Sequence, residues 1–252
     1  MSVLAFCFLV VAGIAGGLTG SIAGLASLAT YSGLLAVGLS PIDANVTNTV
    51  ALTFSTIGSV LGSRPELRGQ GPFLRPLVPV AVLGGVLGGA LLLSTPADGF
   101  EKVVPFLLGA AALTILIPRR RTDPAADAGP TRRHRVLQAV ALGAIAVYGG
   151  YFGAAAGVLL LALLLHSTPL DLPRANAAKN VLLGAANLVA AAGFVVLAPV
   201  QWSAVVPLGI GCLIGARLGP AVVRRSPATV LRWLIGAAGL ALAVHLGIRA
   251  FG

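Results

Sequence analysis

Long apolar runs separated by short basic or proline-rich segments make up most of this chain. The runs cover residues 2–41, 43–62, 73–93, 103–117, 136–166, 175–198, 202–223 and 230–247. A helix that crosses a membrane needs about twenty apolar residues, whereas the strands of a membrane barrel alternate apolar and polar positions over about ten residues. The continuous runs therefore predict an all-α polytopic membrane protein.

Two of the runs, 2–41 and 136–166, are too long for one crossing. Each has a glycine-rich middle, Gly16–Gly24 in the first and Gly149–Gly157 in the second. Both middles follow the pattern G-G-x-x-G-x-x-x-G at a constant offset of 133 residues. Because glycine weakens a helix and permits unusual backbone angles, we expect each run to be a broken helix hairpin.

Further matches indicate an internal repeat. Residues 40–43 (Ser-Pro-Ile-Asp) and 168–171 (Thr-Pro-Leu-Asp) both resemble a helix start, with a capping hydroxyl and an early proline. At an offset of 131, Asn45 matches Asn176, and two apolar pairs also match: Val50 with Val181 and Leu52 with Leu183. We predict a first transmembrane repeat at 1–117, a linker at 118–135 and a second repeat at 136–252. Each repeat would hold one hairpin plus three transmembrane helices, giving eight to ten membrane segments.

The positive charges predict an orientation. The linker at 118–135 carries six arginines, and short loops rich in Lys and Arg lie on the cytoplasmic side. Counting crossings from a cytoplasmic linker places the loops at 64–68 and 224–225 on the same side and both termini outside. The two halves then run in opposite directions, as inverted-topology repeats of secondary transporters do. If each long run were a single crossing, the halves would instead run parallel.

Composition excludes several classes. The chain is 57% hydrophobic and 10% charged, with a mean hydropathy of +0.97, whereas soluble domains are about a quarter charged. The net charge of +10 does not indicate nucleic acid, because the basic residues fall in short loops. No Lys or Arg precedes Arg64, so the first run lacks the basic start of a signal peptide, and we expect it in the mature protein. Cys7 and Cys212 lie in apolar runs, as packing residues do.

The polar residues inside apolar runs are the candidate site. Lys179 lies in the segment 171–187, and a lysine within a membrane span is a functional candidate, although it could also snorkel to the cytoplasmic face. Asn176, Asn180 and Asn187 are spaced by four and seven residues, so they share one helix face. Their amides could donate to an anion or join helices by hydrogen bonds.

The echo of this segment at 43–56 supplies candidates for an opposite wall. The glycine-rich breaks could expose backbone N–H groups that favour anions, or they could serve close helix packing. The predicted substrate-binding residues are Lys179, Asn176, Asn180, Asn187, Asn45, Thr47, Asn48, Thr49, Gly20, Gly24, Gly153 and Gly157. No nucleotide-binding loop, metal cluster or nucleophile with a base is evident, so we predict no cofactor, no metal and no enzyme.

The chain resembles the TauE/SafE family of sulfite-exporter-like permeases at the glycine-rich stretches Gly16–Gly24 and Gly149–Gly157, at Ala175–Asn180 and Gly211–Gly219, and at Asn187 and Trp202. The resemblance covers almost the whole chain, and its most specific motif is A-N-x-x-K-N at 175–180. It implies an inner-membrane transporter of small sulfur-containing or organic anions, with Lys179, Asn176 and Asn180 on one wall and residues 45–49 on the other. Family members often have a denser glycine run than this chain has at 23–27 and 154–157.

The leading hypothesis is a secondary permease that moves a small anion, such as sulfite, a sulfonate or a related organic anion, across the cytoplasmic membrane. The alternatives are a passive channel-like anion pathway and a non-transporting membrane scaffold. The expected partners are the anion and the lipid bilayer. The sequence does not decide whether the protein forms a homo-oligomer. The sequence does not identify the anion, the direction of transport or the coupling ion.

Overall fold

Every element in the described part of the chain is a helix. The computed structural model describes residues 2–95, 132–153 and 155–225, with single positions beyond 225. The helices are α1 (Val3–Ala23), α2 (Ala26–Ala36), α3 (Pro41–Gly62), α4 (Arg64–Leu67), α5 (Gly71–Leu74), α6 (Leu77–Ser94), α8 (Arg132–Tyr151), α9 (Ala156–Ser167), α10 (Leu172–Leu197) and α11 (Trp202–Arg225). The predicted spans at 103–117 and 230–247 lie outside the described residues, as does the linker up to 131. Residues 132–135, predicted as loop, are instead the first turn of α8.

The first predicted helix start is confirmed and the second is wrong by three residues. Ser40 caps α3, where its Oγ accepts a hydrogen bond from the Asp43 N–H at 3.2 Å. In the second half the cap is Asp171, whose Oδ1 accepts from the Arg174 N–H at 2.9 Å. Thr168 lies at the end of α9 instead, because its hydroxyl donates to the Leu164 carbonyl at 2.6 Å.

Each glycine-rich stretch breaks the chain once, at the end of the first stretch and in the middle of the second. Helix α1 continues through its first three glycines and ends before Gly24, whose φ of +80° is a left-handed conformation that favours glycine. Helix α8 ends at Tyr151, and Gly153 has a φ of +74°. The following helices, α2 with 11 residues and α9 with 12, are shorter than a full crossing requires. The predicted broken hairpins are therefore α1–α2 and α8–α9.

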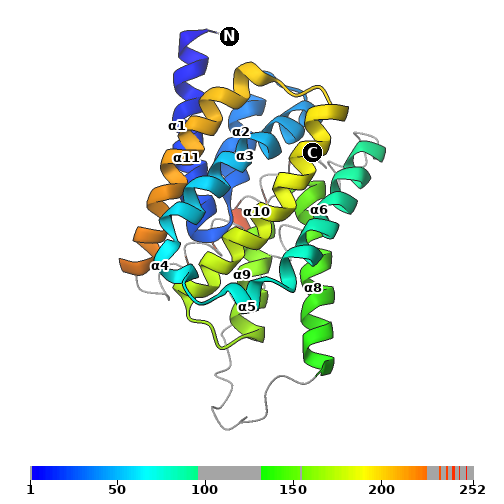
Figure 1. Cartoon of the computed structure of the whole chain (residues 1–252). Coiled ribbons are helices and arrows are strands. Elements are labelled where there is room, and N and C mark those ends of the chain that lie inside the picture. Colours follow the sequence, from blue (N-terminus) through cyan, green and yellow to red (C-terminus); the bar gives the residue numbers. More distant parts are fainter. Residues whose placement is uncertain are drawn as a thin grey trace.

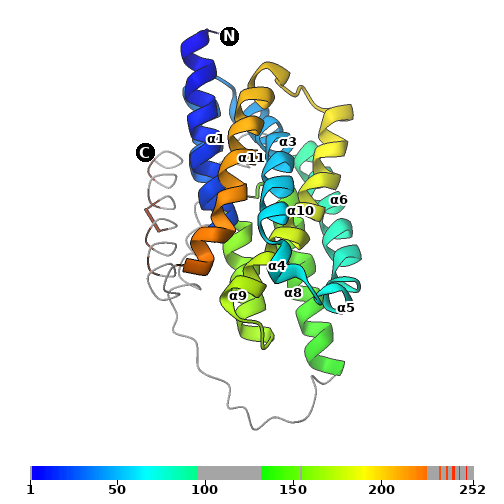
Figure 2. The ribbon, with the colours of Figure 1, turned by 60° about the vertical axis from the view of Figure 1, so that its left-hand side comes forward.

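The long helices stand side by side (Figure 1). Helix α1 packs along α11 and α8 packs along α6, while α3 and α10 contact each other between these pairs. Figures 1 and 2 show α1 and α3 descending, whereas α8 and α10 ascend. The N-terminus and the turn before α11 lie at one end, and α4, α5 and the start of α8 lie at the other.

Glycines bring the outer helix pairs into backbone contact. A Cβ on Gly211 or Gly215 of α11 would collide with the backbone of α1, and a Cβ on Gly84 or Gly88 of α6 would collide with the backbone of α8. The atoms met are Val10 O and Ile14 N for Gly211, Ile14 O and Leu18 N for Gly215, Gly143 O and Val147 N for Gly84, and Val147 O and Tyr151 N for Gly88. Small residues allow this close approach of helices in membranes.

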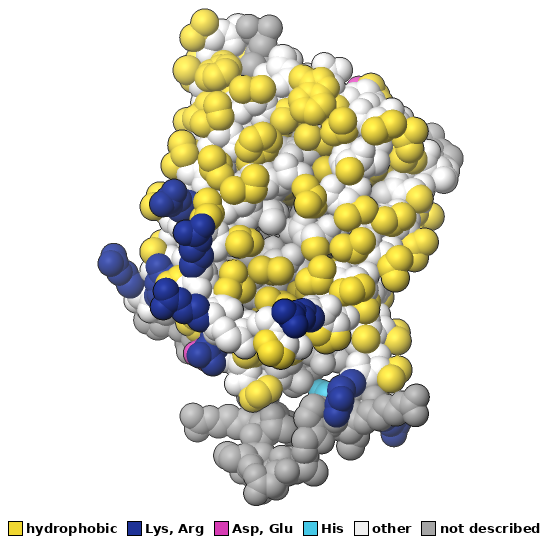
Figure 3. Space-filling view, viewed as in Figure 1, with side chains coloured by type: hydrophobic (Ala, Val, Ile, Leu, Met, Phe, Trp, Pro, Cys, Tyr) yellow, Lys and Arg dark blue, Asp and Glu magenta, His cyan; other side chains and the backbone are white. Residues whose placement is uncertain are grey.

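The surface is typical of a multi-pass membrane protein. Three described helices, α1, α10 and α11, are long and apolar enough to cross a membrane. Figure 3 shows apolar side chains over most of one face, with Lys and Arg gathered toward the lower end. The exposed arginines at the loops and helix ends are Arg64, Arg68, Arg75, Arg133, Arg135, Arg174, Arg224 and Arg225. Such one-sided positive charge is what membrane orientation requires.

Candidate functional site

A small cavity lies where the break after α1 meets α3 and α10. Its volume is about 50 Å³, which is room for roughly three to five water molecules. The lining residues are Gly20, Ser21, Gly24, Ala26, Leu52, Ser55, Thr56, Ser59, Gly153, Lys179, Asn180, Leu183, Gly184 and Asn187. Six of the twelve predicted site residues are among them.

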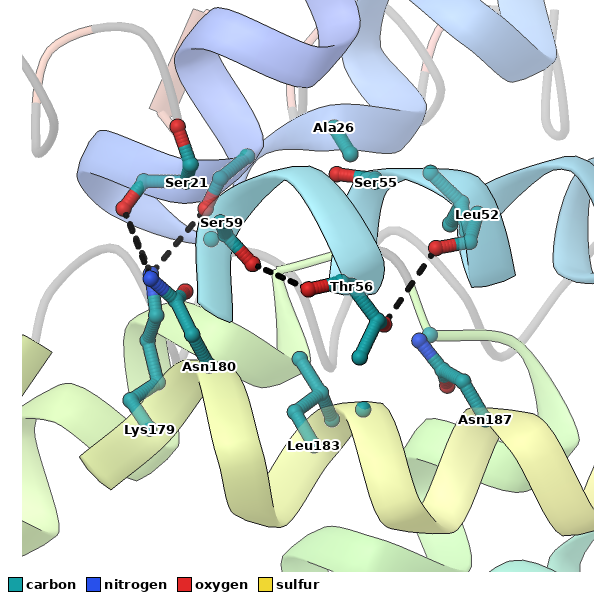
Figure 4. A pocket seen from close by; sticks show the side chains of 14 residues that line it. Ser21, Ala26, Leu52, Ser55, Thr56, Ser59, Lys179, Asn180, Leu183 and Asn187 are labelled. Carbon is teal, nitrogen blue, oxygen red and sulfur yellow. Dashed lines mark hydrogen bonds between the residues drawn. The ribbon is translucent and has the colours of Figure 1, made fainter. Parts of the chain in front are cut away.

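Lys179 is buried at one end of this cavity, with 1% of its surface exposed. Its ammonium donates to the carbonyl oxygens of Gly20 at 3.0 Å and Ser21 at 3.4 Å (Figure 4). Both carbonyls belong to the last turn of α1, where the helix dipole favours a cation. The side chain therefore caps a broken helix and does not snorkel to the cytoplasmic face.

Two of the three predicted asparagines on α10 join this cap. The amide of Asn176 donates to the Ser21 carbonyl at 2.8 Å, and that of Asn180 reaches the same oxygen at 3.5 Å. Asn187 lies two turns further along, is 8% exposed and extends toward Thr56 (Figure 4). Its amide has no hydrogen-bond partner among the described residues, so it is available to a ligand in the cavity.

Three hydroxyl residues of α3 form the facing wall, and sequence reasoning missed them. The Thr56 hydroxyl donates to Leu52 O at 3.3 Å and the Ser59 hydroxyl donates to Thr56 O at 3.1 Å. Their oxygens therefore keep lone pairs for the cavity, and Ser55 lies beside them. Ser55 and Ser59 follow Asn48 by seven and eleven residues, a helical spacing that could have identified this wall.

The four predicted residues of α3, at positions 45 and 47–49, are buried but lie outside the cavity lining. Each bonds a neighbouring segment or its own helix. Asn45 donates to Tyr151 O at 3.1 Å, Thr47 accepts from the Gln201 N–H at 3.1 Å, Asn48 donates to Ser27 Oγ at 3.2 Å, and Thr49 donates to Asn45 O at 3.0 Å. Gly157 lies next to the cavity, because a Cβ there would meet the Cα of Gly24. These residues connect elements that surround the site.

The cavity combines groups that attract an anion. Ala26, the first residue of α2, lines it, and no side chain caps the first turn of α2. A helix N-terminus carries partial positive charge and exposes N–H groups, and the ammonium of Lys179 adds a full charge. None of the described residues that line the cavity is a carboxylate. Among the described residues, no group of three or more His, Cys, Asp and Glu side chains could hold a metal ion.

Comparison with known proteins identifies the family. Curated relatives include the probable membrane transporter protein ORF9 of Sinorhizobium sp (28% identical over 95% of this chain and 91% of that one) and a probable membrane transporter protein of Haemophilus influenzae (26%, over 85% and 84%). The probable membrane transporter protein YfcA of Escherichia coli K12 is 23% identical over 87% of this chain and 81% of its own. No solved structure matches the chain significantly. The family model described as "Sulfite exporter TauE/SafE" matches residues 6–246, and the chain therefore belongs to the TauE/SafE family.

Proposed function

We propose that this protein is a secondary transporter that moves a small anion across the cytoplasmic membrane through the cavity at Lys179. The observation that carries the proposal is the joint placement of the Lys179 ammonium, the uncapped start of α2 and the unpartnered Asn187 amide around one cavity. The names of these relatives, all probable membrane transporter proteins, agree with transport.

The size and polarity of the cavity favour a small oxyanion. A volume of about 50 Å³ holds roughly four heavy atoms, about the size of sulfite, or the charged head of a sulfonate. Amide and hydroxyl groups suit such an anion because its oxygens accept several hydrogen bonds. In the low-dielectric surroundings the attraction of Lys179 for a negative charge is stronger than it would be in water.

Lys179 also offers a way to couple substrate binding to movement. An anion in the cavity competes with the carbonyls of Gly20 and Ser21 for the ammonium. Gly20 O also accepts from the Gly24 N–H at 2.7 Å, and Ser21 O also accepts from Asn176 at 2.8 Å. Because both carbonyls keep a donor, Lys179 can turn to the anion and loosen the contact between α10 and α1 at small cost.

Inverted repeats around the cavity would supply the alternating access. The cavity lining contains three pairs related by the repeat offsets, namely Gly20 with Gly153, Leu52 with Leu183, and Thr56 with Asn187. The glycine contacts between α6 and α8 repeat those between α11 and α1, with the atoms on α8 lying 133 residues after those on α1. Both observations support a two-fold relation through the site, on which rocking of one half against the other is commonly built.

Transport in proteoliposomes tests the proposal. We expect saturable uptake of radiolabelled sulfite, accelerated when unlabelled sulfite is present inside, because a carrier exchanges substrate and a passive channel does not. Lys179→Gln should lower the initial rate by at least about tenfold, since it removes a charge-assisted hydrogen bond. The matched control Arg217→Gln removes an exposed charge from α11 and should leave the rate unchanged. Absence of transport for sulfite, sulfonates and carboxylates, or equal rates for Lys179→Gln and wild type, would overturn the proposal.

A further inference from the structure

Within the described part of the chain, three asparagines have a buried side-chain oxygen without a hydrogen-bond partner. These are Asn45, Asn48 and Asn176, each 1% exposed. Almost all buried polar atoms in proteins are paired, so an unpaired acceptor needs an explanation. The anion transport proposed above does not supply one, because an acceptor oxygen repels an anion and attracts a cation.

An asparagine from each half of the chain caps the C-terminal end of the first helix of the other half. On α10, Asn176 donates to Ser21 O in the last turn of α1. On α3, its counterpart Asn45 donates to Tyr151 O, the last residue of α8. Both contacts place an asparagine against a helix C-terminus, which carries partial negative charge.

The two caps differ in one respect. Three residues after Asn176, Lys179 adds its ammonium to the carbonyls of α1. Three residues after Asn45, the chain has Asn48, a neutral side chain whose Oδ1 is unpaired. The end of α1 thus has a tethered cation, whereas the matching position on α3 has a side chain whose amide donates to Ser27 Oγ of α2 and whose oxygen has no partner among the described residues.

We propose that a monovalent metal cation, with Na⁺ the first candidate, binds at the C-terminal end of α8 between the side-chain oxygens of Asn45 and Asn48 and the carbonyl of Tyr151. The two side chains lie three residues apart on one face of α3, and the amide of Asn45 already reaches the Tyr151 carbonyl. Helix-end carbonyls and uncharged oxygens coordinate Na⁺ in broken-helix transporters.

The charge of the ligands selects the class of ion. Amide and backbone oxygens are hard ligands that suit Na⁺, and none of the three is a carboxylate. Tight divalent sites rely on several carboxylates to offset the second charge. The Lys179 ammonium on the opposite cap shows that one positive charge is tolerated at a helix end of this kind.

Thermal unfolding of the purified full-length protein tests the site without any transported anion. The melting temperature is measured in NaCl, KCl and choline chloride at constant ionic strength. A cation that binds only the folded protein stabilises it in a saturable manner. We expect NaCl to raise the melting temperature of the wild type above its value in choline chloride. Equal melting temperatures in all three salts would overturn the proposal and would instead indicate that water satisfies these oxygens.

Substitutions at Asn48 locate the site. Asn48→Asp, which is nearly isosteric, adds a negative ligand and should lower the half-saturating NaCl concentration by about tenfold. Asn48→Lys should supply a tethered ammonium, as Lys179 does, and remove the response to NaCl. The control Thr53→Val, whose hydroxyl donates only to Val50 O on its own helix at 2.7 Å, should keep the wild-type response. An unchanged half-saturating concentration in Asn48→Asp would contradict this location even if Asn48→Lys does not fold.

Discussion

At the scale of single residues, Lys179 contributes little net stability despite its burial. A lysine at the centre of a membrane helix costs about 2.5–3.5 kcal/mol. Its shorter hydrogen bond, to Gly20 O at 3.0 Å, returns about 1.5–3 kcal/mol, whereas the contact with Ser21 O at 3.4 Å is long and therefore weak. The two carbonyls that it contacts each keep another donor, Gly24 N–H or the Asn176 amide. The folding energy therefore does not require a lysine at this position, which agrees with the proposed role of Lys179 in anion binding.

The substitution Lys179→Met distinguishes a role of the lysine in folding stability from a role in anion transport. We expect its free energy of unfolding to stay within about 1 kcal/mol of the wild type, which corresponds to about 2–4 °C in melting temperature, while anion transport is lost. Leu182→Ala, at a fully buried apolar position of the same helix, should cost about 2–5 kcal/mol and shows that the assay detects a structural defect. If Lys179→Met lowered the melting temperature as much as Leu182→Ala does, the lysine would be a structural cap.

The sequence predicted the α10 wall and the glycines at the helix breaks, but it missed the α3 wall of the cavity for a physical reason. Lys179 and Asn187 are conspicuous because an ammonium or an amide is costly in a membrane span. Serine and threonine are not, because their hydroxyls can bond the carbonyls of their own helix, as Thr56 and Ser59 do. Asn45 and Asn48 are costly as well, but they bond the adjacent segments. Which polar groups face the cavity is decided by tertiary packing, which the pattern along one helix does not contain.

At the scale of elements, the glycines have two structural roles, breaking a helix and allowing close helix packing, which cannot be told apart in the sequence. Gly24 has a left-handed conformation and ends α1. Gly13 and Gly17 have helical neighbours on both sides and instead allow α11 to approach. The pattern of glycines predicted that a break exists, but it did not place the break, because a helix packed through glycine and a helix broken at glycine have the same residues.

Gly17→Ala tests the packing task. A Cβ at this position would meet Cys212 O and, at 2.8 Å, Ala216 N, both backbone atoms of α11. We expect a loss of about 1–3 kcal/mol from overpacking, measured as a lower melting temperature and a lower yield of monodisperse protein. The control Gly193→Ala lies within α10 with no atom within 4 Å of the added Cβ and should gain up to about 1 kcal/mol in helix propensity. Equal effects of both changes would show that α1 and α11 do not need this contact.

At the scale of the whole molecule, the two halves are similar in path and different in charge. Glycines at corresponding positions allow close packing of α11 against α1 and of α6 against α8. Gly24, at the break after α1, contacts Gly157, which follows the break after α8. The correspondence fails at Lys179, because its counterpart Asn48 carries no charge. Opposite charge preferences at the two caps would let one protein bind an anion on the Lys179 side and a cation on the Asn48 side, which is the arrangement that ion-coupled transport requires.

The inverted arrangement predicts which loops and termini face each side of the membrane. In a background with Cys7→Ala and Cys212→Ala, we expect Ser2→Cys and Gln201→Cys to react with a membrane-impermeant thiol reagent on intact bacterial cells, and Arg68→Cys to react only after permeabilisation. All three positions are exposed, and the arginine-rich end that contains Arg68 should face the cytoplasm. Protection of Ser2→Cys on intact cells would place the start of α1 in the cytoplasm. It would thereby reject the inverted arrangement on which the alternating-access proposal depends.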